Sequence, residues 1–196
     1  MTAYKDRSVL SIVPTKNFQD NGVRESLITM SSHTGTHIDA PAHFLAEGAT
    51  SEHITFDATI GPCTVLDMTH CEQVITVDDL SKVKAHLRKG ARLLFKTRNS
   101  LRSTTDSFDS EFVYINKEAA LYLAQHAVQT VGIDYLGIER DQKEHDTHIT
   151  LMHANVVIVE GLRLADVMPG DYFLYCLPLA LVGIDGAPAR AVLIQQ

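Results

Sequence analysis

Four residues that can bind a metal or move a proton lie within eleven residues of this chain. They are His33, His37, Asp39 and His43, separated by threonine, glycine and proline. Imidazole nitrogen together with carboxylate oxygen suits zinc, manganese and iron, and the segment has no thiolate. It therefore predicts a metal centre. The alternative is a chance surface cluster, since ten histidines are scattered along the chain.

The residues between these four side chains disfavour a helix. Thr34, Thr36 and Ile38 are β-branched, and Gly35 and Pro41 lower helix stability further. All four candidates have odd numbers, so an extended chain directs them to one side. A straight strand would hold His33 and His37 about 13 Å apart, yet both must come within about 2.1 Å of one zinc ion. We therefore predict a strand or loop that curls at Gly35.

The composition fits one folded domain over residues 1–196, with a hydrophobic fraction of 45%. The net charge is −7 and basic residues are not clustered, so no nucleic-acid partner is expected. No apolar run could span a membrane or act as a signal peptide, which favours the cytoplasm. Cys63, Cys71 and Cys176 form no paired motif and are predicted to be buried or reduced thiols.

Strand and helix patterns alternate, which predicts an α/β fold with a mixed sheet flanked by helices. Strand patterns cover residues 60–69 and 92–97, and short apolar runs typical of buried strands cover 131–134 and 156–160. Two more strands in 172–196 flank a Gly-Ile-Asp-Gly turn. Thr76 begins a helix expected to end near Arg88, before Gly90, and Asn116 begins another that runs through Ala127. The first thirty residues show little regular pattern, and residues 99–109 are expected to form an exposed loop.

A metal centre needs further ligands, and two candidates lie downstream. Glu160 ends a buried-strand pattern, where a carboxylate is costly unless it is paired or binds a cation. The alternative for Glu160 is a salt bridge to Arg163. His148 is the second candidate, with an ordinary surface or core histidine as its alternative. His70 has no supporting pattern.

The segment His33–Phe44 resembles the signature H-x-G-T-H-x-D-x-P-x-H-F of the metal-dependent cyclase family, which includes bacterial kynurenine formamidases and isatin hydrolase. Residues 148–152 (HITLM) resemble the family's H-x-x-L-L, and residues 157–162 (VIVEGL) its I-x-x-E-x-L. Residues 177–190 are similar to its C-terminal block. The resemblance covers roughly residues 30–195 and implies a fold of the swivelling β/β/α type.

The resemblance also implies a role for each matching residue. Five positions match ligands of one or two divalent ions, with zinc expected before manganese: His33, His37, Asp39, His148 and Glu160. Asp39 is placed to bridge two ions. His43 matches the histidine that acts as general acid and base.

The implied reaction is hydrolysis of an amide-type carbon–nitrogen bond, in a formamide or a cyclic amide, by water activated at the metal. The alternative is a non-hydrolytic cyclase or dehydratase that uses the same metal. The expected partners are a small-molecule substrate and further copies of the chain, in a homodimer or larger homo-oligomer. The chain has no tryptophan, a residue that formamidases of the tryptophan pathway tend to contribute, so a kynurenine substrate does not follow.

Overall fold

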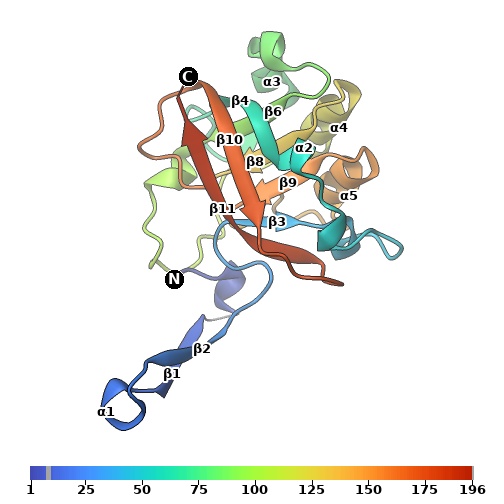
Figure 1. Ribbon diagram of the computed structural model, residues 1–196. Coiled ribbons are helices and arrows are strands. Elements are labelled where there is room, and N and C mark those ends of the chain that lie inside the picture. Colours follow the sequence, from blue (N-terminus) through green and yellow to red (C-terminus); the bar gives the residue numbers. More distant parts are fainter. Residues whose placement is uncertain (8–9, 196) are drawn as a thin grey trace.

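Seven strands close into a barrel (Figure 1), in the order β10-β11-β3-β9-β8-β6-β4. The computed structural model describes residues 1–7 and 10–195. The barrel strands are β3 (His37–Asp39), β4 (Ile60–Asp67), β6 (Arg92–Lys96), β8 (Thr130–Ile133), β9 (Val157–Glu160), β10 (Gly170–Pro178) and β11 (Gly186–Ile194). Strands β4, β6, β8 and β9 run parallel, and the other neighbours are antiparallel. The predicted mixed sheet is confirmed. Its closure is a feature that strand patterns alone do not specify.

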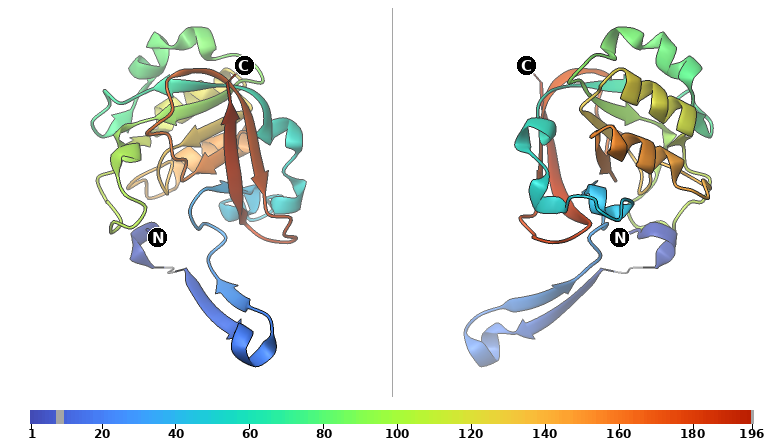
Figure 2. Two further views of the ribbon diagram at one scale, coloured as in Figure 1. Left: turned by 60° about the vertical axis from the view of Figure 1, so that its left-hand side comes forward. Right: turned by 90° about the vertical axis from the view of Figure 1, so that its right-hand side faces the viewer.

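The helices are short, and α4 and α5 lie side by side against the parallel strands (Figure 2). They are α1 (Phe18–Asn21), α2 (Phe56–Thr59), α3 (Val77–Lys82), α4 (Lys117–Gln125) and α5 (Asp146–His153). The short strands β5 (Val74–Ile75) and β7 (Tyr114–Ile115) pair with each other. Within the described ranges, no helix has the length and apolar character needed to cross a membrane.

Both predicted helix starts are confirmed. The Asn116 side chain accepts a hydrogen bond from the backbone N–H of Ala119, and Thr76 forms a capping box with Asp79. The predicted end near Arg88 is wrong. Val83 leaves helical geometry (φ −111°, ψ 19°), so α3 ends at Lys82 and one 3₁₀ turn (Lys84–His86) follows.

Successive residues of the parallel strands enter two different cores. In β6, Leu93 and Phe95 pack beneath the helices, whereas Leu94 enters the barrel interior. In β9, Ile158 and Val159 divide in the same way. Because both faces are buried, these strands appear in the sequence as continuous apolar runs. The three cysteines are buried free thiols, as predicted.

Two segments differ from the predictions. Strands β1 (Ser11–Lys16) and β2 (Glu25–Thr29) form an antiparallel hairpin that projects from the barrel (Figure 2). Both of its faces are exposed, so no alternation of apolar and polar residues marks these strands. The expected exposed loop at 99–109 is wrong at its start, because Asn99 and Ser100 are buried and hydrogen-bond to Asp134.

Candidate metal centre

Strand β3 directs two of the predicted ligands to the outside of the barrel. Ile38 enters the barrel interior together with Val159, so its neighbours His37 and Asp39 point the opposite way. His37 is the direct antiparallel partner of Glu160, which places both side chains on this outer face. Helix α5 packs against β9, and its residue His148 reaches the same site.

The chain curls before β3, as predicted. Gly35 has a left-handed φ of +66°, and its carbonyl accepts a hydrogen bond from His37 Nδ1 at 2.8 Å. This bond leaves His37 Nε2 as the nitrogen that faces the site. A Cβ atom on Gly161 would lie 2.2 Å from the Gly35 carbonyl oxygen, so only glycine permits this approach.

The extended segment is shorter than predicted. Regular strand covers only His37–Asp39, and His43 reaches the site from the 3₁₀ turn Pro41–His43. Proline at the first position of that turn has the backbone angle the turn requires.

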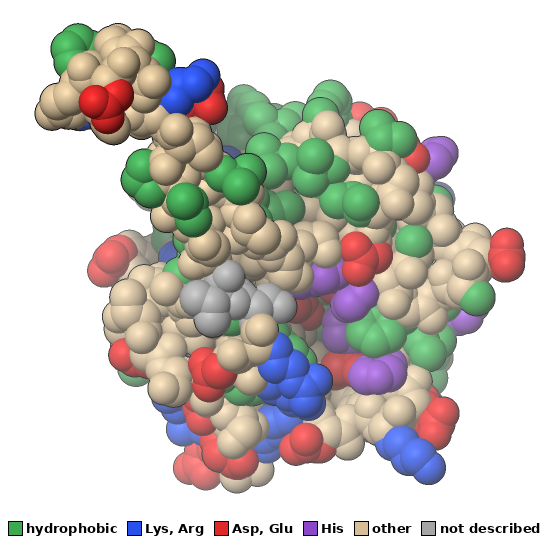
Figure 3. Space-filling model, turned by 90° about the horizontal axis from the view of Figure 1, so that it is seen from below, with side chains coloured by type: hydrophobic (Ala, Val, Ile, Leu, Met, Phe, Trp, Pro, Cys, Tyr) green, Lys and Arg blue, Asp and Glu red, His purple; other side chains and the backbone are tan. Residues whose placement is uncertain are grey.

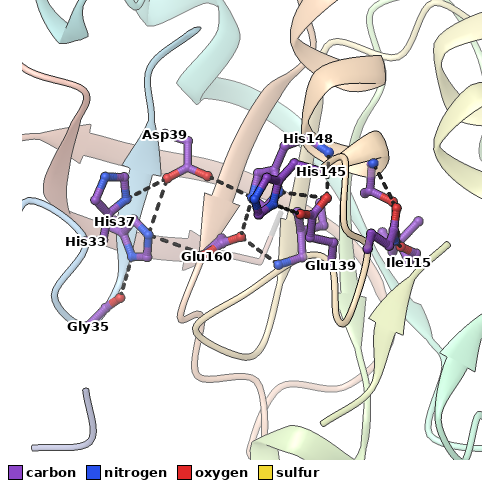
Figure 4. Close-up of polar contacts among 12 residues, drawn as sticks. His33, Gly35, His37, Asp39, Ile115, Glu139, His145, His148 and Glu160 are labelled. Atoms are coloured by element: carbon purple, nitrogen blue, oxygen red, sulfur yellow. Dashed lines mark hydrogen bonds and ion pairs between the residues drawn. The ribbon is translucent and has the colours of Figure 1, made fainter. Parts of the chain in front are cut away.

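Imidazole and carboxylate groups converge on Asp39 (Figure 4). Its Oδ1 atom lies 2.9 Å from His33 Nδ1 and 3.4 Å from His37 Nε2, and its Oδ2 atom lies 3.5 Å from His148 Nε2. The two oxygens of Glu160 lie 3.4 Å from His37 Nε2 and 3.2 Å from His148 Nε2. The structure therefore brings all five predicted ligands together, in two triples that share Asp39.

These donor atoms fit a cation better than they fit one another. His37 Nε2 and Asp39 Oδ2 are buried, and neither makes a hydrogen bond within the part of the chain that the structure describes. Two ligands about 2.0–2.1 Å from one tetrahedral ion are separated by about 3.3 Å, close to the nitrogen–oxygen distances found here. Nitrogen and oxygen donors without sulfur suit zinc or manganese.

The charges of the site also favour a bound cation. Burial alone would lower the pKa of His37, but the carboxylates of Asp39 and Glu160 raise it to about 10. The pKa of His148 is likewise raised despite its burial, because Asp39, Glu139 and Glu160 surround it. The carboxylates therefore favour protonation of both buried imidazoles, which adds two positive charges to the core. A divalent cation would supply the same charge in place of those two protons.

Glu160 is not paired with Arg163, the alternative considered from the sequence. The Arg163 guanidinium donates instead to the backbone oxygen of Arg102. Glu160 Oε1 accepts the backbone N–H of Ile138 at 2.6 Å, which fixes the carboxylate towards His148.

His43 lies beside the predicted ligands and faces a carboxylate of its own. Its ring stacks on His33 with 3.9 Å between ring centroids, and its Nδ1 atom lies 3.6 Å from Asp185 Oδ2. Asp185 also contacts His33 Nε2 at 3.1 Å and accepts a hydrogen bond from the Ser32 hydroxyl. Burial lowers the pKa of His43 below its ordinary value, so its neutral form predominates at neutral pH.

Sequence reasoning missed a carboxylate that contacts the second ring nitrogen of His148. Glu139 Oε2 lies 3.0 Å from His148 Nδ1 and accepts the His148 backbone N–H, while Oε1 lies 2.5 Å from His145 Nδ1. Metal-binding histidines commonly have such a carboxylate on the second ring nitrogen. Glu139 precedes α5 in an irregular segment, where no sequence pattern marks it.

A cavity of about 310 Å³ opens beside the site. His43, His148 and Glu160 form part of its wall, while the apolar side chains of Phe44 and Leu136 line another part. Seen from this side, histidine and acidic side chains gather in a hollow of the surface (Figure 3). The volume and the mixed lining are typical of a small-molecule pocket.

Known proteins match this chain over most of its length. A sequence model of the family described as Putative cyclase matches residues 3–140. The kynurenine formamidase of Geobacillus thermodenitrificans (strain NG80-2) is 38% identical over 176 residues, which are 89% of this chain and 82% of that protein. The structure of a predicted metal-dependent hydrolase from Bacillus stearothermophilus is 46% identical with a TM-score of 0.87, over 98% of this chain and 91% of the other. Isatin hydrolase A from Labrenzia aggregata, bound to benzyl benzoate, shares the fold at 20% identity with a TM-score of 0.83, over 97% and 85%.

Proposed function

This chain belongs to the cyclase family and is a hydrolase of that family, and we propose that it cleaves an amide-type carbon–nitrogen bond, in a formamide or a cyclic amide. One observation carries the proposal: two triples of donor atoms, buried except for the partly exposed His33, share Asp39 beside a pocket of small-molecule size. The relative with 38% identity bears the name of a formamidase, which supports the same class of bond.

We place a divalent cation among the five donors around Asp39, with zinc expected before manganese. The proposed ligands are His33, His37, Asp39, His148 and Glu160. One ion would use one triple, and two ions would use both triples with Asp39 between them. When bound, the cation supplies a Lewis acid and lowers the pKa of water towards neutrality.

His43 is the residue that we assign to proton transfer. The Asp185 carboxylate lies 3.6 Å from its Nδ1 atom, and this nearby charge favours the hydrogen on that nitrogen and leaves Nε2 to take a proton. In our proposal His43 Nε2 takes a proton from the attacking water and delivers it to the leaving nitrogen. The Phe44 ring lies against both His43 and His148, and it shields this edge of the pocket from water.

The test is an assay of purified protein loaded with zinc or manganese, beside protein stripped with a chelator. Suitable substrates are a simple formanilide, N-formylkynurenine and isatin, with formate or the ring-opened acid as the measured product. Metal-dependent release of acid or formate supports the proposal. A cyclised or dehydrated product without acid release favours the non-hydrolytic alternative. Failure to turn over any amide in the metal-loaded state overturns amide cleavage.

Self-association and a cytoplasmic location stay predictions. The projecting hairpin exposes apolar side chains at Ile12, Val13, Leu27 and Ile28, which is unusual for a surface that contacts only water. Light scattering of the purified protein measures whether it is a monomer, a dimer or a larger assembly.

A further inference from the structure

A second group of metal-binding side chains lies where the loop after β4 meets the start of α3. His70 and Cys71 are neighbours in that loop, and Asp79 belongs to the first turn of α3. Helix α3 lies at the end of the molecule away from β3 (Figure 1), so this group is separate from the centre around Asp39. We propose that His70, Cys71 and Asp79 form a binding site for a thiophilic divalent cation, with zinc as the first candidate.

The distances within the group match those between ligands of one ion. His70 Nε2 lies 3.1 Å from Asp79 Oδ1 and 3.7 Å from Cys71 Sγ. Around a tetrahedral zinc ion, with bonds of about 2.0–2.1 Å to nitrogen and oxygen and about 2.3 Å to sulfur, these separations are about 3.3 Å and 3.6 Å. The side chains thus hold the required arrangement already. The His70 side chain is half exposed, which leaves room for water as a fourth ligand.

The capping box of α3 fixes the Asp79 carboxylate. Its Oδ2 atom accepts hydrogen bonds from the Thr76 backbone N–H at 3.1 Å and the Thr76 hydroxyl at 2.6 Å. Its Oδ1 atom is turned towards His70, and the Lys82 ammonium also lies 3.1 Å from that oxygen. The Lys82 side chain is mostly exposed, and exposed ion pairs of this kind contribute little, so an arriving cation can displace it at small cost.

Cys71 supplies the donor that determines which metals fit. Burial, together with the negative charges of Asp79 and Asp67, raises the pKa of the thiol to about 11. The thiol therefore carries its proton at neutral pH, and this proton passes to solvent as the sulfur–metal bond forms. A thiolate beside imidazole and carboxylate favours zinc or cobalt over magnesium and calcium. The group around Asp39 contains no sulfur, so the two sites differ in chemistry and this proposal does not depend on amide cleavage.

Cobalt(II) distinguishes the two sites because only a thiolate ligand gives a sulfur-to-cobalt charge-transfer band. Chelator-stripped, reduced, full-length protein is titrated with cobalt(II) while near-ultraviolet absorption is followed. We expect a charge-transfer band whose absorbance at saturation corresponds to one thiolate-bound cobalt ion per chain. The band should be lost when zinc is added. Absence of the band in the wild-type protein overturns the proposal.

Variants assign the band to its ligands. Cys71→Ser should abolish the band, whereas Cys63→Ser, which changes a thiol in the barrel interior, and Asp39→Asn should keep it. Because Cys71 is buried and its replacement could disturb folding, His70→Gln at the half-exposed position is the second test. We expect this variant to bind cobalt at least about tenfold more weakly at the thiolate site. A band that persists in Cys71→Ser, or an affinity that His70→Gln leaves unchanged, contradicts the proposed ligand set.

Discussion

Two buried carboxylates at the ends of neighbouring parallel strands have opposite surroundings. Asp134 follows β8 and accepts hydrogen bonds from the backbone N–H and hydroxyl groups of Thr97 and Ser100, at distances from 2.7 to 3.1 Å. Glu160 ends β9 and faces the imidazoles of His37 and His148. Neutral donors satisfy Asp134 fully. The group around Glu160 leaves buried polar atoms that only a further partner can satisfy.

The pKa values follow the same division. Burial raises the pKa of Asp134 in spite of its hydrogen bonds from Ser100 and Thr97. Burial and the nearby Asp39 charge act in the same direction on Glu160, yet the His148 and His37 imidazoles bring its pKa below the ordinary value. A buried carboxylate alone is therefore weak evidence for a metal site. What marks a metal site is the kind of donor around the carboxylate and the atoms left unpaired.

Of the two buried carboxylate sites, the one that contains Asp39 should show the largest loss of metal binding and activity when it is altered. Asp39→Asn removes a charge shared by both donor triples, while its size hardly changes. Loss of a carboxylate behind a ligand weakens metal binding about 10–100-fold, so loss of a shared ligand should exceed about 100-fold and remove activity with it. Metal content after dialysis, measured by elemental analysis, checks this outcome.

The matched control is Asp134→Asn, the same substitution at the other buried carboxylate. It should keep a stoichiometric metal content, since Asp134 contacts only Thr97, Asn99 and Ser100 among the described polar groups. Stoichiometric metal in Asp39→Asn would show that Asp39 is not a ligand. Metal loss in both variants would show that the substitutions disrupt the fold rather than remove a ligand.

The next largest effect should come from His43, which separates proton transfer from metal binding. General acid–base catalysis contributes about 10²–10⁴-fold, so His43→Gln should lower kcat by that order while the metal stays bound. KM should change much less than kcat. Steady-state kinetics with parallel metal analysis measure both quantities, and an unchanged kcat would remove His43 from the mechanism.

The barrel strands could be predicted because their sequence patterns carry the physical cause of their burial. Residues 93–95 and 156–159 are apolar on both faces, and the strands are covered both by helices and by the barrel interior. The hairpin of β1 and β2 could not be predicted, since its strands have no buried face. The early end of α3 depends on the backbone geometry of Val83, which no local sequence pattern predicts.

The candidate site divides in a similar way. The spacing of His37 and Asp39 within one short strand is local, so the sequence alone predicts that they share a face. That His148 and Glu160 lie beside them depends on the order of strands in the barrel, and the family resemblance supplied it. Glu139 acts through tertiary contacts with His148 and has no local signature, so it was missed.

Glu139 offers a smaller and sharper test of the site. Glu139→Gln keeps the shape of the side chain but removes the charge behind His148 Nδ1. Such partners of metal ligands affect metal affinity or activity by about 10–100-fold, less than a ligand itself. Competition with a chelator of known affinity measures the change. An effect as large as that of Asp39→Asn would make Glu139 a ligand, and no effect would show that His148 needs no support from it.

Asp134→Asn should change stability and leave catalysis per folded molecule intact. An amide cannot replace both carboxylate oxygens as acceptors for the backbone N–H groups of Thr97 and Ser100, so we expect a loss of about 1–3 kcal/mol at neutral pH. Because the pKa of Asp134 is raised on folding, its contribution to stability is fully present below the ordinary pKa of an aspartate and declines as the pH rises through the raised value. The difference in unfolding free energy between the wild type and Asp134→Asn should therefore shrink with rising pH, as urea titrations at several pH values would measure.

Asp39, whose pKa is lowered on folding, should show the opposite dependence on pH. Its contribution to stability is present above the ordinary aspartate pKa and is lost as the pH falls through the lowered value. If both variants show the same dependence on pH, the two carboxylates do not differ in the way that their neighbours indicate.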